Sequence, residues 1–96
     1  MSDAPHRSAL AVRLYSTGPQ CTLCVRTLAD LEALSGRYRI AIERVSVDPS
    51  RIGPRRLAWR VPVVEVNDEV IAEGRIEASA LEAALRACGA EPREHA

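Results

Sequence analysis

The sequence contains no lysine and no phenylalanine, and all 13 of its basic residues other than histidine are arginines. A core without phenylalanine must be built from leucine, isoleucine, valine and alanine. The 13 acidic residues balance the arginines to a formal net charge of zero, which argues against nucleic acid or an anionic membrane as the main partner. No apolar run approaches the about 20 residues of a membrane-spanning helix. The N-terminal residues lack a signal peptide's apolar region, so we expect a cytoplasmic protein.

Cysteine is also scarce, with three residues in the 96. Cys21 and Cys24 form one closely spaced pair, and no second pair completes the usual ligand set of structural zinc. In a reducing compartment, such a pair is typically catalytic or metal-binding rather than a structural disulfide. The third cysteine, Cys88, falls on the apolar stripe of the last predicted helix, and we expect it to be buried and inert.

The cysteine pair lies where a predicted strand is followed by a predicted helix. Alternating Leu10, Val12 and Leu14 predict a strand over about residues 9–15. Gly18-Pro19 predicts a turn. A helix is then predicted over residues 22–35, ended by Gly36. Its apolar residues recur at three-residue steps: Val25, Leu28, Leu31 and Leu34.

This placement has a chemical consequence for the two sulfurs. Cys21 falls at, or one residue before, the first turn of the helix. There, unpaired backbone N–H groups and the helix dipole stabilise a thiolate. Cys24, on the side of Leu28 and Leu31, is expected to be the more buried sulfur and to contact Cys21 across one turn. An activated, exposed thiol beside a covered one is the arrangement that thiol–disulfide exchange requires.

The remaining elements follow from pattern and turn residues. Strands are predicted over residues 40–47, 61–66 and 69–73, with a tight turn at Asn67-Asp68. Residues 49–58 predict a short, poorly patterned helix. The last helix covers about residues 77–88, with a capping box at Ser79–Glu82 if it starts late.

This order predicts an α/β fold, β-α-β-α-β-β-α. The first two strands should be parallel and joined by a right-handed crossover. We expect one four-stranded mixed sheet with helices on its faces. Residues 9–88 form a single domain in this interpretation, between a mobile N-terminal tail, 1–8, and a C-terminal tail, 89–96.

Charged residues occur within two of the predicted strands. Arg13 and Glu65 are predicted to lie on the less covered face of the sheet, on neighbouring antiparallel strands, and to pair there. Further arginines surround the cysteine pair and the third strand, namely Arg26, Arg51, Arg55, Arg56 and Arg60. They form either an electropositive rim that favours a thiolate or a solvated basic surface.

The motif of strand, Gly18-Pro19-Gln20-Cys21-Thr22-Leu23-Cys24, helix, strand, Val61-Pro62, hairpin and helix resembles the thioredoxin fold. The resemblance covers about residues 9–88. It is closest to small bacterial glutaredoxin-like domains with a Cys-x-Leu-Cys motif. The sequence departs from familiar dithiol glutaredoxins in three respects. Thr22-Leu23 replaces Pro-Tyr, no lysine precedes the motif, and the Gly-Gly and acidic pair is reduced to Ala72-Glu73-Gly74-Arg75.

The resemblance implies a thiol–disulfide oxidoreductase with a redox-active disulfide, in which Cys21 is the nucleophile and Cys24 the resolving thiol. It implies a cis-proline at Pro62, facing the sulfurs. Val61 would pair its backbone with the incoming substrate or glutathione. Gln20, Thr22 and Leu23 would complete the substrate-binding surface.

The same resemblance defines the expected partners. The substrate would be a disulfide-containing protein or small molecule. The reductant would be cytosolic, either glutathione or a donor of the thioredoxin-reductase type. No bound cofactor or metal is expected, with glutathione as the candidate co-substrate. Two alternatives stay open: a redox-inert binding module with this fold, and a metal or cluster site on Cys21 and Cys24, completed by a second chain or by Cys88, His95 or His6.

Overall fold

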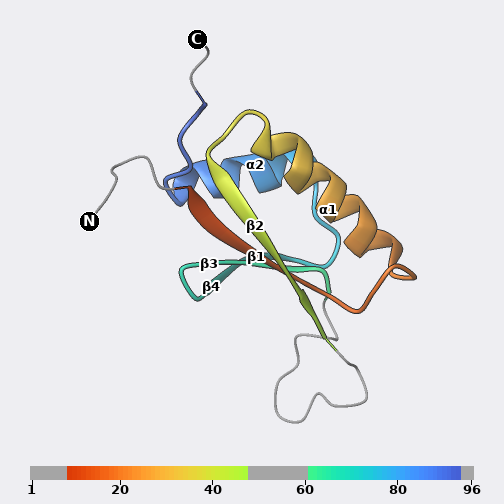
Figure 1. The fold of residues 1–96 in the computed structure, drawn as a ribbon. Coiled ribbons are helices and arrows are strands. Elements are labelled where there is room, and N and C mark those ends of the chain that lie inside the picture. The colour runs from red at the N-terminus through yellow and green to blue at the C-terminus, as the bar shows by residue number, and fades with distance from the viewer. Residues whose placement is uncertain (1–8, 48–60, 94–96) are drawn as a thin grey trace.

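The computed structural model describes residues 9–47 and 61–93 (Figure 1). The described elements are β1 (Leu10–Ser16), α1 (Thr22–Ser35), β2 (Ile40–Ser46), β3 (Val63–Val66), β4 (Glu69–Glu73) and α2 (Ala78–Ala87). The strands form one sheet in the order β2-β1-β3-β4. β1 and β2 are parallel, and the other neighbours are antiparallel. This is the predicted mixed sheet, and the fold is thioredoxin-like. The N-terminal tail and the helix predicted within residues 49–58 lie outside the described residues.

The core lies between the sheet and the two helices. Val12 and Leu14 of β1 pack there, together with Leu31 of α1 and Leu81 and Leu85 of α2, all at most 1% exposed. Both helices therefore cover the same face of the sheet (Figure 1). The strand alternation explains this, because the opposite face presents charged side chains along β1, β2 and β3.

Helix α1 has the predicted bounds, but its buried face is not the predicted stripe. The buried residues are Cys24, Thr27, Leu31 and Leu34. Val25 is 51% exposed, so its assignment to the apolar face is wrong. A strict three-residue step drifts around a helix of 3.6 residues per turn. Cys24 lies seven residues, or about two turns, before Leu31 and therefore on the same face of the helix. Val25, the next residue, is rotated by about 100° from Cys24 and lies off that face.

The hairpin β3–β4 turns at Asn67 and Asp68, as predicted. Their φ angles are 54° and 64°, the left-handed conformation of a two-residue hairpin turn. β3 begins at Val63, later than predicted, because proline lacks the N–H that strand pairing needs. Pro62 instead accepts a hydrogen bond through its carbonyl oxygen from Gly74 N–H, at 2.8 Å.

Helix α2 begins at Ala78 with Glu77 as its N-cap, and no side chain caps it. The proposed capping box at Ser79 is therefore not formed. Gly89 ends the helix with a φ of 97°. The chain then turns back, because Arg39 N–H donates to Glu91 O and Arg93 N–H donates to Arg37 O, both at 2.8 Å. The folded part of the chain thus extends beyond residue 88 to residue 93.

Candidate redox site

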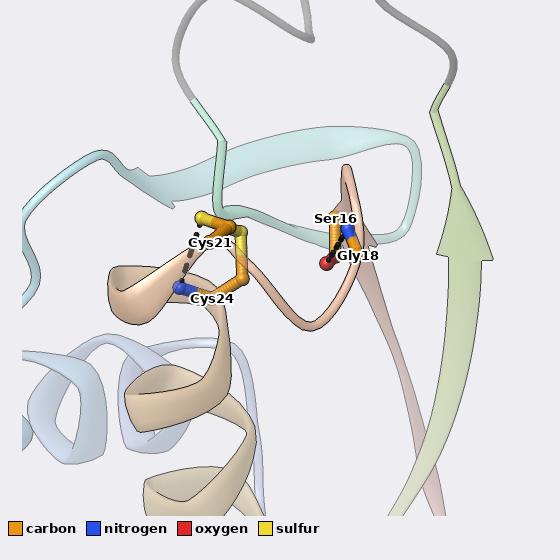
Figure 2. Close-up of a disulfide and its surroundings, with 4 residues drawn as sticks. All are labelled: Ser16, Gly18, Cys21 and Cys24. Atoms are coloured by element: carbon orange, nitrogen blue, oxygen red, sulfur yellow. Dashed lines mark hydrogen bonds between the residues drawn. A yellow bond between two sulfur atoms is a disulfide. The ribbon is translucent and has the colours of Figure 1, made fainter.

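A tight loop connects β1 to α1 and carries the cysteine pair (Figure 2). Gly18 has a φ of 130°, a backbone conformation that residues with a Cβ rarely adopt, so the position favours glycine. Gly18 N–H donates to Ser16 Oγ at 3.0 Å, and its carbonyl accepts from Cys21 N–H at 3.1 Å. These hydrogen bonds fix the loop conformation that places Cys21 at the N-cap of α1.

Cys21 is the N-cap of α1, with φ −86° and ψ 101°. Its Sγ accepts a hydrogen bond from Cys24 N–H at 3.2 Å (Figure 2), the role that a serine or aspartate oxygen commonly has at this position. The first turn of α1 contains no acidic residue. A reduced Cys21 in this position faces the positive end of the helix dipole and a backbone donor. Both features are ones that stabilise thiolates at helix N-termini in general.

The two sulfurs form a disulfide, with Cα atoms 5.2 Å apart, within the ordinary range for such bonds. Cys24 is 2% exposed, whereas Cys21 is half-buried. The prediction of one accessible and one covered cysteine is confirmed. Cys21 is thus the more accessible of the two sulfurs, and Cys24 is its covered disulfide partner one turn further along the helix.

The segment around Pro62 lies at the same end of the sheet as the disulfide loop. Tyr15 pairs with Val63 between β1 and β3, so Pro62 comes opposite Ser16, where β1 ends and the loop begins. The Val61–Pro62 peptide bond is cis, and Pro62 is fully buried. Val61 is half-buried. Arg51, Arg55, Arg56 and Arg60 of the predicted rim lie outside the described residues.

The other predicted site residues differ in exposure. Gln20 and Thr22 are exposed, and Leu23 is half-buried. Leu23 lines a small cleft of about 180 Å³ between α1 and the chain before α2. Arg26 and Arg75 contribute positive charge to this cleft, and Asp30 and Glu77 contribute negative charge. The cleft therefore presents both signs of charge.

A second, larger hollow of about 520 Å³ lies on the other side of the disulfide. It is lined by residues of the loop, by Cys24 and Val25 of α1, and by the end of β2. Its existence was not predicted. The depression lies between two elements whose spacing depends on the crossover packing, which the local sequence pattern does not encode.

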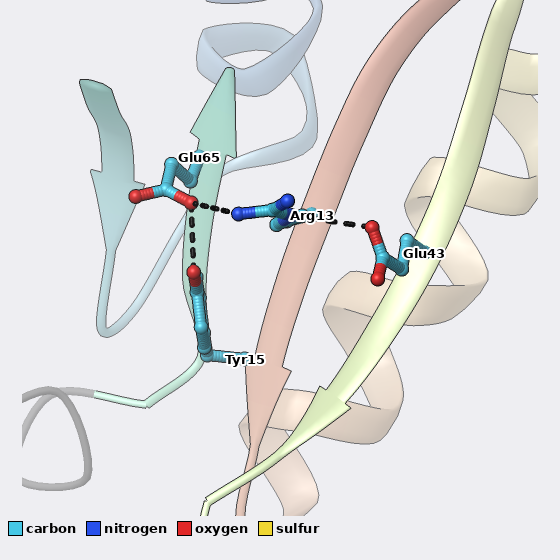
Figure 3. Close-up of polar contacts among 4 residues, drawn as sticks. All are labelled: Arg13, Tyr15, Glu43 and Glu65. Carbon is cyan, nitrogen blue, oxygen red and sulfur yellow. Dashed lines mark hydrogen bonds and ion pairs between the residues drawn. The ribbon is translucent and has the colours of Figure 1, made fainter. Parts of the chain in front are cut away.

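A polar network occupies the face of the sheet opposite the two helices (Figure 3). Arg13 Nη1 lies 3.5 Å from Glu65 Oε1, and these residues are directly opposite on β1 and β3, so the predicted pair is confirmed. Arg13 Nε also donates to Glu43 Oε1 at 3.2 Å. Tyr15 donates its hydroxyl to Glu65 Oε1 at 2.7 Å, which raises the pKa of Tyr15. Sequence reasoning missed Glu43 and Tyr15.

Cys88 is free and half-buried, and it packs against the core at the C-cap of α2. It is less buried than predicted, because the helix ends there. Among residues 9–47 and 61–93, no group of three or more histidine, cysteine, aspartate and glutamate side chains is placed to hold a metal ion. In the same ranges, no helix is long and apolar enough to cross a membrane.

The comparison with protein families gives one match. Residues 11–86 match the family described as Glutaredoxin-like domain (DUF836). The chain belongs to this family. The matched range of the glutaredoxin-like domain runs from β1 into α2 and includes the cysteine pair and Pro62. A search of curated proteins gave no match. The family and the Cys21–Cys24 disulfide fit a redox-type function.

Proposed function

We propose that this glutaredoxin-like domain is a thiol–disulfide oxidoreductase in which Cys21 attacks and Cys24 resolves. The observation that supports this most strongly is the pair of sulfurs at the start of α1. The accessible Cys21 accepts the N–H of Cys24, and the covered Cys24 is already its disulfide partner. A purely structural disulfide does not need one accessible sulfur at the positive end of a helix.

The reaction begins with the reduced protein. The Cys21 thiolate attacks one sulfur of the substrate disulfide, the substrate S–S bond breaks, and the released thiolate takes up a proton. A mixed disulfide now joins Cys21 to the substrate. Cys24 loses its proton and its thiolate attacks Cys21 Sγ. The Cys21–Cys24 disulfide forms as the second substrate sulfur leaves as a thiolate and is protonated. One disulfide is reduced to two thiols, and the protein dithiol is oxidised.

The electrostatics of the helix N-terminus help in the attack and in the later reduction of the protein. A lowered pKa increases the fraction of Cys21 that is thiolate near neutral pH, but it also reduces intrinsic nucleophilicity, with a Brønsted slope of about 0.4–0.5. The net gain in attack is therefore only a few-fold. The larger effect comes when a donor thiol has formed a mixed disulfide with Cys21. A second donor thiol then attacks the donor sulfur of that disulfide and Cys21 is the leaving group, and a thiol of low pKa leaves faster.

A thiol donor must reduce the Cys21–Cys24 disulfide after each turnover. We propose a low-molecular-weight thiol such as glutathione, two molecules of which supply the two electrons and become a disulfide. The cleft beside Leu23 supports this choice, since Arg26 and Arg75 can receive carboxylates and Asp30 and Glu77 an ammonium group. A donor of the thioredoxin-reductase type is the alternative. We place the reaction in the cytoplasm, where thiols are kept reduced.

The roles of the surrounding residues follow the same logic. We assign to Val61 the backbone pairing with an extended substrate segment, next to the end of β1. The exposed Gln20 and Thr22 flank Cys21 and would contact whatever binds over it. Leu23 would contact the apolar part of a ligand in the adjacent cleft.

The deciding experiment is reduction of a small disulfide and of insulin by the full chain, with glutathione as the donor and Cys21→Ser and Cys24→Ser as comparisons. We expect turnover by the natural chain and none by Cys21→Ser. Cys24→Ser should accumulate a mixed disulfide on Cys21, detected by its added mass. Equal rates for the natural chain and Cys21→Ser with several thiol donors would favour the redox-inert binding module. Metal content after purification tests the metal-binding alternative separately.

A further inference from the structure

The hollow of about 520 Å³ beside the disulfide is a groove between the N-terminal half of α1 and the C-terminal end of β2. We call it the Arg44 groove. Apolar residues of the sheet and the helix make up much of its surface, including Leu14, Val25 and Leu28. Cys24 also lines it. The groove thus reaches the resolving cysteine from the side of β2, away from the cleft at Leu23.

The groove exists because the apolar alternation of β2 stops before the strand does. Ile40 and Ile42 face the helices, the first buried and the second half-buried. The next position on that face is Arg44, which is exposed and pairs in register with Leu14 of β1. An arginine at this position places a solvated cation beside the buried Leu14, where an aliphatic residue would have extended the core.

Among the described residues, the charge that lines the groove has one sign. Within residues 9–47 and 61–93, Arg44 is the one charged lining residue, and no carboxylate lines the groove. Within residues 9–47 and 61–93, the Arg44 guanidinium has no hydrogen-bond or ion-pair partner. Ser16 and Ser46 add two hydroxyl groups. Ser16 Oγ already accepts from Gly18 N–H (Figure 2), so its own proton is available for a ligand. Apolar surface beside an unpaired guanidinium and two hydroxyls complements an apolar side chain next to a carboxylate.

We propose that the Arg44 groove binds the polypeptide flank of a protein disulfide substrate, with an apolar side chain over Val25 and Leu28 and an acidic side chain paired with Arg44. The proposal rests on the oxidoreductase function above and specifies its substrate class. A polypeptide fits better than a small molecule because the lining includes Gly18 and Pro19, in the loop that leads directly to Cys21. A bound flank can therefore continue directly to a substrate cysteine at Cys21.

The reach of an extended chain sets the spacing that the substrate needs. Each extended residue spans about 3.3–3.6 Å. We allow about two to four extended substrate residues, or about 7–14 Å, for the path from Cys21 past Pro19 into the groove. The apolar and acidic residues should therefore lie within about two to four positions of the reacting cysteine. The groove does not by itself fix whether they precede or follow it.

The test uses peptides closed by one disulfide and reduced by the full chain with glutathione as donor. Three flanks are compared, each placed before or after the cysteine: leucine with glutamate, leucine with glutamine, and serine with glutamate. The comparison is made with the flank on the side of the cysteine that gives the faster reduction. There we expect kcat/KM for the leucine–glutamate peptide to be about two- to fivefold higher than kcat/KM for the leucine–glutamine peptide, as for an exposed charge pair. It should exceed the serine–glutamate peptide by about fivefold or more, because apolar contact is lost.

Arg44→Gln should remove the preference for glutamate over glutamine, and Arg44→Glu should reverse it in favour of a leucine–lysine peptide. Arg86→Gln is the matched control, because it removes one exposed arginine from the last turn of α2, outside the groove. It should keep the preference. A glutamate preference that survives Arg44→Gln, or equal kcat/KM for all flanks, would overturn the proposal. Self-association through this groove, abolished by Arg44→Glu and unaffected by peptide, would also overturn it.

A small disulfide without a peptide flank separates this proposal from the oxidoreductase function. If the natural chain reduces 2-hydroxyethyl disulfide and Arg44→Gln does so equally well, the oxidoreductase function stands. The flank comparison then decides whether the Arg44 groove binds the substrate polypeptide. If no disulfide is reduced, the function fails. Peptide binding in the Arg44 groove is then tested by fluorescence anisotropy of a labelled, cysteine-free leucine–glutamate peptide. Binding weakened by Arg44→Gln supports a peptide site, and tighter binding of a small aryl carboxylate than of the peptide contradicts it.

Discussion

A negative charge placed beside Cys21 should have opposite effects on the helix and on the thiolate. Thr22 is the exposed first residue of α1, next to the N-cap. Thr22→Glu puts a carboxylate at the positive end of the helix dipole, which should stabilise the folded, oxidised protein by about 0.3–1 kcal/mol. The same carboxylate repels an anionic sulfur on Cys21. A model in which Cys21 is merely a structural cap predicts only the first effect.

The size of the repulsion follows from Coulomb's law. At a separation of about 6 Å, two unit charges in water-like surroundings interact by about 0.7 kcal/mol, and by more where the solvent is partly excluded. Salt at physiological concentration reduces this. An energy of about 0.5–1 kcal/mol lowers the ratio of thiolate to thiol at Cys21, at a given pH, by about two- to fivefold. The pKa of Cys21 should therefore rise.

The assay is the rate of alkylation by iodoacetamide as a function of pH, in a Cys24→Ser, Cys88→Ser background that leaves one thiol. The reagent is neutral, so the new charge does not change its approach. Cys24→Ser retains the backbone N–H that donates to Cys21 Sγ. Thr22→Gln is the isosteric control. Identical pH profiles for Thr22→Glu and Thr22→Gln would refute the placement of an anionic sulfur at the helix start.

Other predictions concern the fold. Leu31→Ala, at a fully buried position of α1, should lower the free energy of unfolding by about 2–5 kcal/mol in urea titrations. Val25→Ala, at an exposed position, should change it by less than about 1 kcal/mol. Equal losses for the two variants would contradict the assigned buried face of α1. Tyr38 donates its hydroxyl to Glu82 Oε2 at 2.6 Å, which lowers the pKa of Glu82. That stabilisation is present above the unfolded-state pKa of Glu82 and is lost as pH falls through the lowered folded-state pKa. Tyr38→Phe should therefore reduce the loss in the free energy of unfolding that accompanies acidification. An unchanged acid dependence of the free energy of unfolding would contradict this. The pKa of Tyr38 is raised by the same bond, so its stabilisation is lost as pH rises through the folded-state pKa, and Tyr38→Phe should flatten the alkaline limb too.

The local sequence pattern predicts the elements that local chemistry determines. The helix bounds at Thr22 and Ser35 follow from the glycine turn before the cysteines and Gly36 after the last leucine. The hairpin turn follows from Asn67 and Asp68, which tolerate positive φ.

Features that depend on packing between distant segments were predicted less well. Arg13 and Glu65 were paired by strand alternation, but Glu43 joins them through the register of parallel strands separated by a helical crossover, and no local signal sets that register. The exposed Val25 shows the limit of a three-residue step on a helix. The capping box failed because α2 starts at Ala78, one residue before Ser79.

The candidate site divides in the same way. The cysteine pair follows from a motif placed between strand and helix, so the accessible Cys21 and the covered Cys24 were predictable. The Arg44 groove was not, because it results from one arginine on the core-facing side of β2 and from how far α1 lies from that strand. The docking of residues 91–93 against residues 37–39 was equally hidden, since backbone hydrogen bonds there involve no sequence motif.

The most direct test of the central claim is to identify which cysteine of the reduced protein is the thiolate. The fully reduced chain is treated briefly with iodoacetamide across a pH series, and the modified residue is located by peptide mass. We expect Cys21 to be labelled first, with a titration midpoint below the value of about 8.5 for a free cysteine, while Cys24 and Cys88 react more slowly. Labelling of Cys24 as fast as Cys21, or a Cys21 midpoint at or above that of a free thiol, would contradict the account.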